Sequence, residues 1–163
     1  MADPNAFYDM YVMKTSGLTL VAGCSGTEYC RAHASSHDLH SGFISAINSF
    51  SAETFGRESL KTVTLDTVQL NLKIDRANDL IFPFIHPANS SQNLIRTQLE
   101  TMSQRFVEKY GKQARSDVLD DEFFLGFRED LINTGILQAE IQTQLKAGKK
   151  KGRSLLRLFR LKQ

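Results

Sequence analysis

The sequence has only two cysteines, Cys24 and Cys30, too few for the disulfide framework that holds small secreted domains together. Its opening, MADPNAFYDM, is polar and lacks the basic and then apolar pattern of a secretory signal. No apolar run approaches the roughly 20 residues that span a bilayer. We therefore expect a protein of a reducing, cytoplasmic compartment.

A strong charge of one sign is also absent. The formal net charge is +2 over 163 residues, and the apolar and charged fractions, 41% and 23%, are those of an ordinary soluble domain. The chain has no basic stretch interleaved with aromatic residues, so we expect no nucleic acid among its partners. Positive charge gathers only near the C-terminus, in 146–162, which contains no acidic residue.

Catalytic and cofactor motifs are missing as well. The turn at 23–26, GCSG, lacks the lysine and the spacing of a phosphate-binding loop. Ser36, His37 and Asp38 are adjacent, and adjacent residues rarely converge on one catalytic site. The sequence therefore predicts that the protein is not an enzyme and carries no cofactor.

One cluster of metal-ligand types remains, made of Cys24, Cys30, His33 and His37, with His40 nearby. Cysteine and histidine are the usual ligands of zinc, but the spacing of these two cysteines is wider than that of common zinc sites. We expect scattered polar loop residues here and no bound metal. The alternative is a sensor domain that binds zinc or a small molecule.

The residues 38–56, DLHSGFISAINSFSAETFG, have the spacing of an amphipathic helix. Ser35 or Ser36 can cap its start, and Gly56 stands where such a helix ends. Gly42 and the serines keep part of it narrow enough to lie close against a sheet. The apolar positions, which we expect to face that sheet, are Leu39, Phe43, Ile47, Phe50 and Phe55, with Ile44 and Ala46 beside them.

Strand patterns lie on both sides of this helix. Before it, Ser16-Gly17 is a hairpin turn signal between two short β-type segments. After it, the apolar period changes to two, which is the period of a half-buried strand. Pro83 falls in the last, fully apolar strand, where it can donate no ladder hydrogen bond. The predicted strands are 11–15, 18–22, 60–65, 68–74 and 80–85.

Two further helices follow the strands. The first opens at 87–90 and is expected to end at Gly111, and the second is capped by Asp120 or Asp121. The order is therefore strand, strand, helix, three strands, helix, helix. Because strands and helices do not alternate, this order excludes a doubly wound parallel sheet. It predicts an α+β fold with a five-stranded antiparallel sheet in residues 1–135, followed by a basic helical extension in 136–163.

Three segments resemble the longin domain, and in particular stand-alone longin-like proteins of archaeal type in the longin and roadblock superfamily. They are the hairpin YVMKTSGLTLVAG, the helix and strand pair LHSGFISAINSFSAETFG and ESLKTVTLDTVQLNLKID, and the apolar strand NDLIFPFIH. The resemblance covers about 11–110. It implies a profilin-like sheet whose fifth strand lies centrally beside the first, so that Pro83 would require either a bulge or a different placement of the strand.

The resemblance implies a role without chemistry. Longin domains are platforms in membrane traffic and vesicle transport that bind small GTPases, other longin or roadblock domains, or a peptide folded back on the domain. We therefore expect an interaction module, with a second copy of this chain among its partners. Its working surfaces would be the exposed side of the first helix, the edge strand 60–65 and the C-terminal helices. The polar candidates there are Ser45, Asn48, Ser49, Glu53, Lys61 and Thr62.

The basic end of the chain, KAGKKKGRSLLRLFRLKQ, can form an amphipathic helix. Such a helix can lie on an anionic membrane surface, where each basic residue contributes about 1 kcal/mol at most. It can instead dock on the domain or a partner, or stay disordered. The residues that would act at a membrane are Lys149, Lys150, Lys151, Arg153, Arg157, Phe159 and Arg160.

Overall fold

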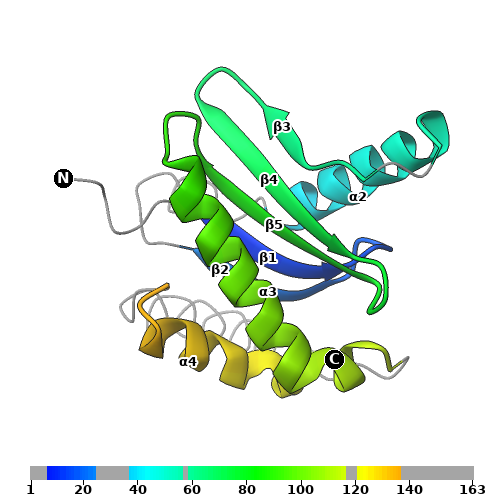
Figure 1. Cartoon of the computed structure of the whole chain (residues 1–163). Coiled ribbons are helices and arrows are strands. Elements are labelled where there is room, and N and C mark those ends of the chain that lie inside the picture. The colour runs from blue at the N-terminus through cyan, green and yellow to red at the C-terminus, as the bar shows by residue number, and fades with distance from the viewer. Residues whose placement is uncertain (1–6, 25–36, 57–58, 117–120, 137–163) are drawn as a thin grey trace, which may run out of the picture.

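Five strands pair in the order β2-β1-β5-β4-β3, and every neighbouring pair is antiparallel (Figure 1). The computed structural model describes residues 7–24, 37–56, 59–116 and 121–136. The strands are β1 (Asp9–Lys14), β2 (Thr19–Cys24), β3 (Thr62–Thr64), β4 (Val68–Asp75) and β5 (Leu80–Pro87). The helices are α2 (His37–Thr54), α3 (Gln92–Ala114), the 3-10 turn η2 (Asp121–Phe124) and α4 (Leu125–Asn133).

This architecture confirms the predicted α+β class, the element order and the central place of β5 beside β1. The turns also fall where the sequence signals them. Gly17, at φ +95°, closes the β1–β2 hairpin, and the amide of Leu65 donates to the carbonyl of Val68 across the β3–β4 turn. Glycine is favoured at the first turn because other residues are strained at positive φ.

Pro83 lies in the centre of the sheet without the bulge that we expected there. The β4–β5 register runs unbroken past it, and Pro83 faces Leu72. The β1–β5 ladder instead pairs Met10 with Phe84 and Met13 with Ile81, and it is interrupted between these pairs. Proline has no N–H, so the hydrogen bond that is missing at this position is one to β1. The sheet does contain a register shift, but it lies in the β1–β2 pair.

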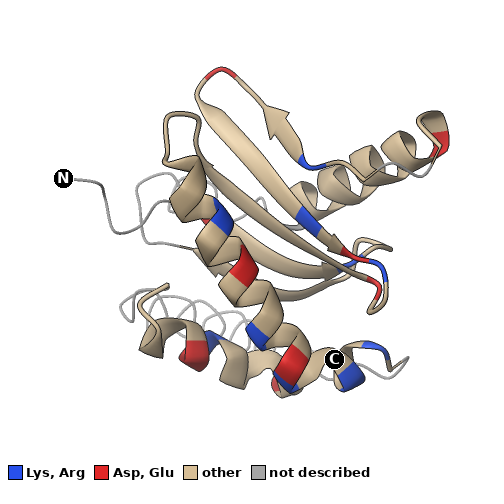
Figure 2. Ribbon diagram, viewed as in Figure 1, with Lys and Arg blue, Asp and Glu red and all other residues tan. Residues whose placement is uncertain are grey.

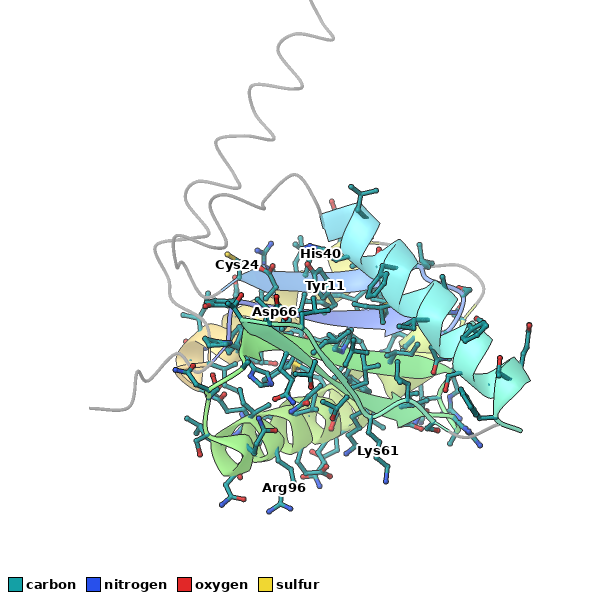
Figure 3. The ribbon with its side chains drawn as sticks, turned by 90° about the horizontal axis from the view of Figure 1, so that it is seen from above. Tyr11, Cys24, His40, Lys61, Asp66 and Arg96 are labelled. Carbon is teal, nitrogen blue, oxygen red and sulfur yellow. The ribbon has the colours of Figure 1, made fainter. Side chains whose placement is uncertain are left out.

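The helices cover both faces of the sheet, with α2 on one face and α3 and α4 on the other (Figures 1 and 3). The larger core lies under α3 and α4. Phe106 of α3 is its centre, with ring centroids 5.0–5.9 Å from those of Phe82, Tyr110, Phe124 and Phe127. Aromatic rings at such distances pack edge-to-face or offset, and they bury large apolar areas.

The bounds of α3 differ from those predicted. The helix begins after Ser91, whose hydroxyl accepts from the amide of Leu94, because Pro87 is still part of β5. It also continues past Gly111 to Ala114. Gly111 is buried inside the helix beside Asn78 of the β4–β5 turn, and a Cβ there would make only ordinary contacts, so it does not act as the helix terminator.

The smaller core lies under α2, and here a second prediction is wrong. Most of the apolar residues predicted to face the sheet do not do so: Leu39, Phe43, Phe50 and Phe55 are exposed. Ile47 is half-buried, and Ile44 is the one α2 residue, among those whose side chains are described, that belongs to the buried members of this core. The sheet already fills the space with large side chains of its own. The other buried members are Tyr11, Met13, Leu70, Leu72, Ile81 and Ile85.

Candidate interaction surface

Small and polar side chains hold α2 against the sheet. Tyr11 Oη lies 3.0 Å from His40 Nδ1, and Ser45 Oγ donates to the carbonyl of Thr15 at 3.0 Å. A Cβ built on Gly17 would lie 3.2 Å from the Cβ of Ser45. The β1–β2 turn can therefore approach the helix closely because Gly17 has no side chain.

Large apolar side chains project from the opposite side of α2. Leu39 is 74% exposed, Phe43 53% and Phe50 63%, and Ala46 between them is also exposed. We call these four residues the apolar stripe. They recur at intervals of four, three and four residues, which is the seam spacing of a coiled coil. A second helix could therefore pack along the stripe.

The stripe is an unusual surface for a chain that stands alone. Single exposed apolar side chains are ordinary, but a contiguous apolar patch marks an interaction site. Gly42 and Ser49, beside the stripe, are exposed and small, and a Cβ built on Gly42 would meet nothing within 4 Å. Because the distance between packed helices depends on the side chains at their contact, these positions permit a close partner.

One edge of the sheet is β3, and the opposite edge, β2, is a strand that contacts α2. β3 pairs only with β4, and Thr62 and Thr64 are exposed. Leu65, which follows, is 59% exposed. An edge strand presents unpaired backbone groups to another chain, although the three residues of β3 make this edge short.

The polar residues predicted to bind a partner are divided between the two sides of α2. Ser49 and Glu53 are exposed, as expected, whereas Ser45 and Asn48 are half-buried and Ser45 bonds the β1–β2 turn. Lys61 and Thr62 are exposed at β3, away from the helix. We did not expect the stripe to point outward. A signal for it exists in the sequence, because residues at intervals of four and three form a narrower apolar face than that of a helix packed on a core.

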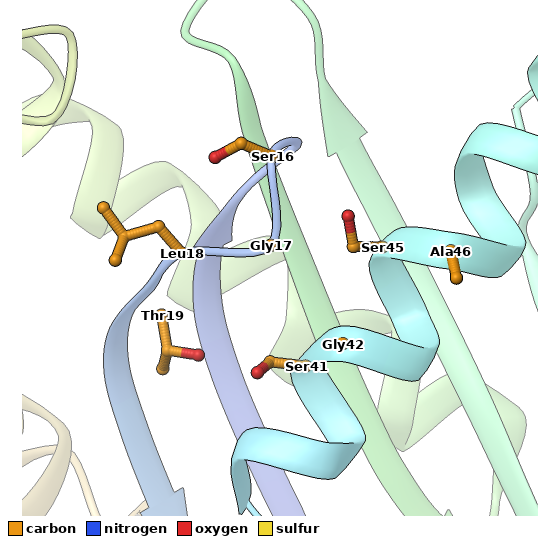
Figure 4. Close-up of a pocket in the computed structure, with 8 residues that line it drawn as sticks. All are labelled: Ser16, Gly17, Leu18, Thr19, Ser41, Gly42, Ser45 and Ala46. Atoms are coloured by element: carbon orange, nitrogen blue, oxygen red, sulfur yellow. The ribbon is translucent and has the colours of Figure 1, made fainter.

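A hollow of about 550 Å³ lies between the β1–β2 turn and α2 (Figure 4). Hydroxyl groups and small residues line it, and none of its lining residues is charged. It offers hydrogen bonds but no acid, base or nucleophile pair. Its lining residues are Ser16, Gly17, Leu18, Thr19, Ser41, Gly42, Ser45 and Ala46.

The predicted metal-ligand cluster is only partly described by the structure. Cys24 lies in a disulfide, so its sulfur is not available as a thiolate ligand. Cys30, His33 and the side chain of His37 lie outside the described residues. Within the part that is described, no three His, Cys, Asp or Glu residues are placed to hold a metal ion.

His40 belongs to a different group. Its Nδ1 is 4.0 Å from Asp9 Oδ2, in addition to its contact with Tyr11, and the side chains of both Asp9 and Tyr11 are fully buried (Figure 3). This group fixes the first turns of α2 over β1. The residues predicted to contact a membrane, Lys149 to Arg160, lie outside the described residues. None of the described helices is long and apolar enough to cross a membrane.

No protein-family model and no curated protein matches the chain. Solved structures with a similar arrangement include MglB of Myxococcus xanthus, at 13% identity and a TM-score of 0.47 over 68% of this chain and 87% of that one. A roadblock/LC7 domain of Streptomyces avermitilis has 12% identity and a TM-score of 0.45 over 63% and 84%. MglC of Myxococcus xanthus has 9% identity and a TM-score of 0.36 over 70% and 88%. Because these identities and TM-scores are low, we base the proposal of a function on the surfaces described above.

Proposed function

We propose that this chain is a non-enzymatic protein-interaction module that binds its partner through the apolar stripe of α2. The observation that carries the proposal is the outward orientation of Leu39, Phe43 and Phe50, each more than half exposed. Burying apolar surface contributes about 25 cal/mol per Å², so covering these three side chains would stabilise a complex by several kcal/mol before association costs.

The partner that fits the stripe best presents a helix with a matching seam. A second copy of α2 has such a seam, and two copies related by a two-fold axis would use the same surface twice. Another domain of longin or roadblock type is an equivalent partner. The small GTPase expected from the longin resemblance would bind either this surface or the assembled pair. A GTPase on the stripe would compete with self-association, whereas a GTPase on the assembled pair would leave the pair intact.

The first experiment compares two triple variants by sedimentation velocity over a range of micromolar concentrations. Leu39→Ser/Phe43→Ser/Phe50→Ser removes the stripe. The matched control, Leu18→Ser/Phe123→Ser/Leu125→Ser, removes three side chains that are 51–56% exposed elsewhere. We expect the wild type and the control to self-associate and the stripe variant to be monomeric.

The same proteins are then tested for binding of small GTPases from the same genome, each loaded with GDP or with a GTP analogue. Binding by the wild type and the control, but not by the stripe variant, would show that GTPase binding requires the stripe, and sedimentation of the wild type with the GTPase then tells whether the pair dissociates or stays intact. A wild type that is monomeric throughout and binds no GTPase in either nucleotide state contradicts the proposal.

We further propose that the basic extension 136–163 contacts an anionic membrane surface, which would make the protein peripheral to the membrane. The support is the arrangement of leucines, Phe159 and basic residues in 154–162. Co-sedimentation with phosphatidylserine vesicles should be lost when 148–163 are removed and weakened by salt. Equal sedimentation of the full and truncated chains would contradict this part of the proposal.

A further inference from the structure

A groove of about 570 Å³ lies on the face of the sheet opposite to α2, between the β3–β4 edge and the first half of α3. Its walls are polar side chains of β4 that are half-buried and side chains of α3 that are mostly exposed. The residues that matter for its chemistry are Lys61, Asn71, Lys73, Gln92 and Arg96.

Positive charge predominates in this groove. Lys73 Nζ lies 2.7 Å from Glu100 Oε1, so these two charges are paired. Lys61 and Arg96 form no ion pair with any residue that the structure describes, and both are exposed. Their side chains extend to the same side of the sheet, away from α2 (Figure 3). Figure 2 shows basic positions on both β4 and α3, with an acidic position between them on α3.

A continuous chain of hydrogen bonds starts in the groove, at Thr62, Asn71 and Gln92, and runs on beyond it to Gln69 and Thr64. Thr62 Oγ1 donates to Asn71 Oδ1 at 3.1 Å, and Asn71 Nδ2 donates to Gln92 Oε1 at 3.2 Å. Gln92 Nε2 donates to Gln69 Oε1 at 2.6 Å, and Gln69 Nε2 donates to Thr64 Oγ1 at 3.1 Å. Each amide nitrogen uses one of its two hydrogens in this chain, so the second can be donated to a ligand.

The groove therefore offers N–H donors and two unpaired cations, which together match a ligand rich in carboxylates. The basic stretch 146–162 of the chain itself has the wrong sign of charge to be that ligand. The groove is also open beside β3, whose outer backbone groups could pair with an extended chain.

We propose that this groove binds an acidic, extended peptide segment of a partner protein, with Lys61 and Arg96 contacting its carboxylates. This site is on the face opposite to the apolar stripe and does not depend on it. A complex formed through α2 would therefore leave the groove accessible, and a single chain would bind two different partners.

The experiment measures fluorescence anisotropy of a fluorescein-labelled peptide of alternating glutamate and serine, against the full chain. The matched probe replaces each glutamate by glutamine, which keeps the shape and removes the charge. We expect the glutamate peptide to bind and the glutamine peptide to bind at least about tenfold more weakly. Added salt should weaken the binding of the glutamate peptide.

Two charge-reversal variants distinguish binding in the groove from attraction by the net charge of the protein. Lys61→Glu/Arg96→Glu should weaken the binding of the glutamate peptide by about tenfold or more. Arg105→Glu/Lys112→Glu makes the same change in net charge at exposed positions of α3 outside the groove, and it should have little effect. The stripe variant should bind the peptide as the wild type does, which keeps this test separate from that of the proposed function.

Three results would overturn the inference. Equal losses in the two charge-reversal variants would show attraction by net charge alone. Equal binding of the two peptides would show that carboxylates are not recognised. Displacement of the labelled peptide by citrate at concentrations similar to those of unlabelled peptide would indicate a site for small carboxylates instead. Circular dichroism and thermal midpoints of the variants check that each remains folded.

Discussion

His86 is the only ionisable side chain in β5, and it is fully buried. Its Nδ1 donates to the carbonyl of Pro87 at 2.8 Å, whereas its Nε2 has no hydrogen-bond partner among the described residues. Burial lowers the pKa of His86 below its usual value of 6.5, and the hydrogen bond to Pro87 opposes this only in part. The folded protein therefore holds a neutral imidazole in an apolar setting.

This burial predicts a dependence of stability on pH. Below about pH 6.5 the unfolded chain binds a proton at His86 that the folded chain does not bind, so the free energy of unfolding should fall as the pH falls. His86→Leu should remove that contribution and cost little at pH 7.5, because it also removes an unpaired polar atom. Urea unfolding at pH 7.5 and 5.5 checks both statements. If the free energy of unfolding changes by the same amount between the two pH values in the wild type and in the variant, both statements are refuted.

Two glycines make a second prediction at the scale of single residues. Gly17→Ala should destabilise the protein by about 1–3 kcal/mol, because φ is +95° and the new Cβ would lie 3.2 Å from Ser45. Gly42→Ala is the control, since Gly42 is in α2 with nothing within 4 Å, and it should stabilise by about 0.5–1 kcal/mol. Thermal unfolding of both variants tests whether the two substitutions change the stability in opposite directions.

At the scale of elements, α2 shows what its sequence could and could not reveal. The apolar period and Gly56 correctly predict a helix and the place where it ends. The period does not say which side of the helix faces the sheet, because the sheet beneath α2 is filled by side chains from strands distant in the chain, such as Tyr11 and Ile81. Orientation was therefore decided by packing that no local pattern contains.

The orientation of α2 predicts a contrast between two neighbouring residues. Ile44→Ala should cost about 2–5 kcal/mol of stability, since Ile44 is 1% exposed within the smaller core. Phe43→Ala should change the stability of the monomer by no more than about 0.5 kcal/mol, since that ring is 53% exposed. Urea unfolding at concentrations too low for association measures both. The reverse order of losses would mean that the stripe faces the sheet.

The contact between α3 and α4 gives a second prediction at the scale of elements. A Cβ built on Gly126 would lie 2.9 Å from Tyr110 Oη, and the Tyr110 ring is packed against Phe106, Phe124 and Phe127. Gly126→Ala should therefore destabilise by about 1–3 kcal/mol, as overpacked cores do. Adding Tyr110→Phe removes the clashing oxygen and should recover part of the loss. A double-mutant cycle with no coupling between the two positions would contradict this contact.

At the scale of the whole molecule, the sheet was more predictable than its surfaces. Alternation in 68–74 and the apolar run 80–85 identify β4 and β5, and the order of elements excludes a parallel sheet. The groove was not predictable, because it combines Lys61 before β3 with Arg96 of α3, and nothing in either segment signals the other. The sequence places Lys61 at an edge strand, and it contains no signal that singles out Arg96.

The pairing of β1 with β5 has a consequence for how the chain folds. The β1–β2 hairpin and the β3–β4–β5 meander each form from nearby residues, but the central ladder joins residues from opposite ends of the sheet-forming region. Closing so long a loop is slow, so this ladder should form late in refolding. Until it closes, the hairpin of one molecule can add to the meander of another, and crowded refolding would yield interlocked copies that exchange their first two strands.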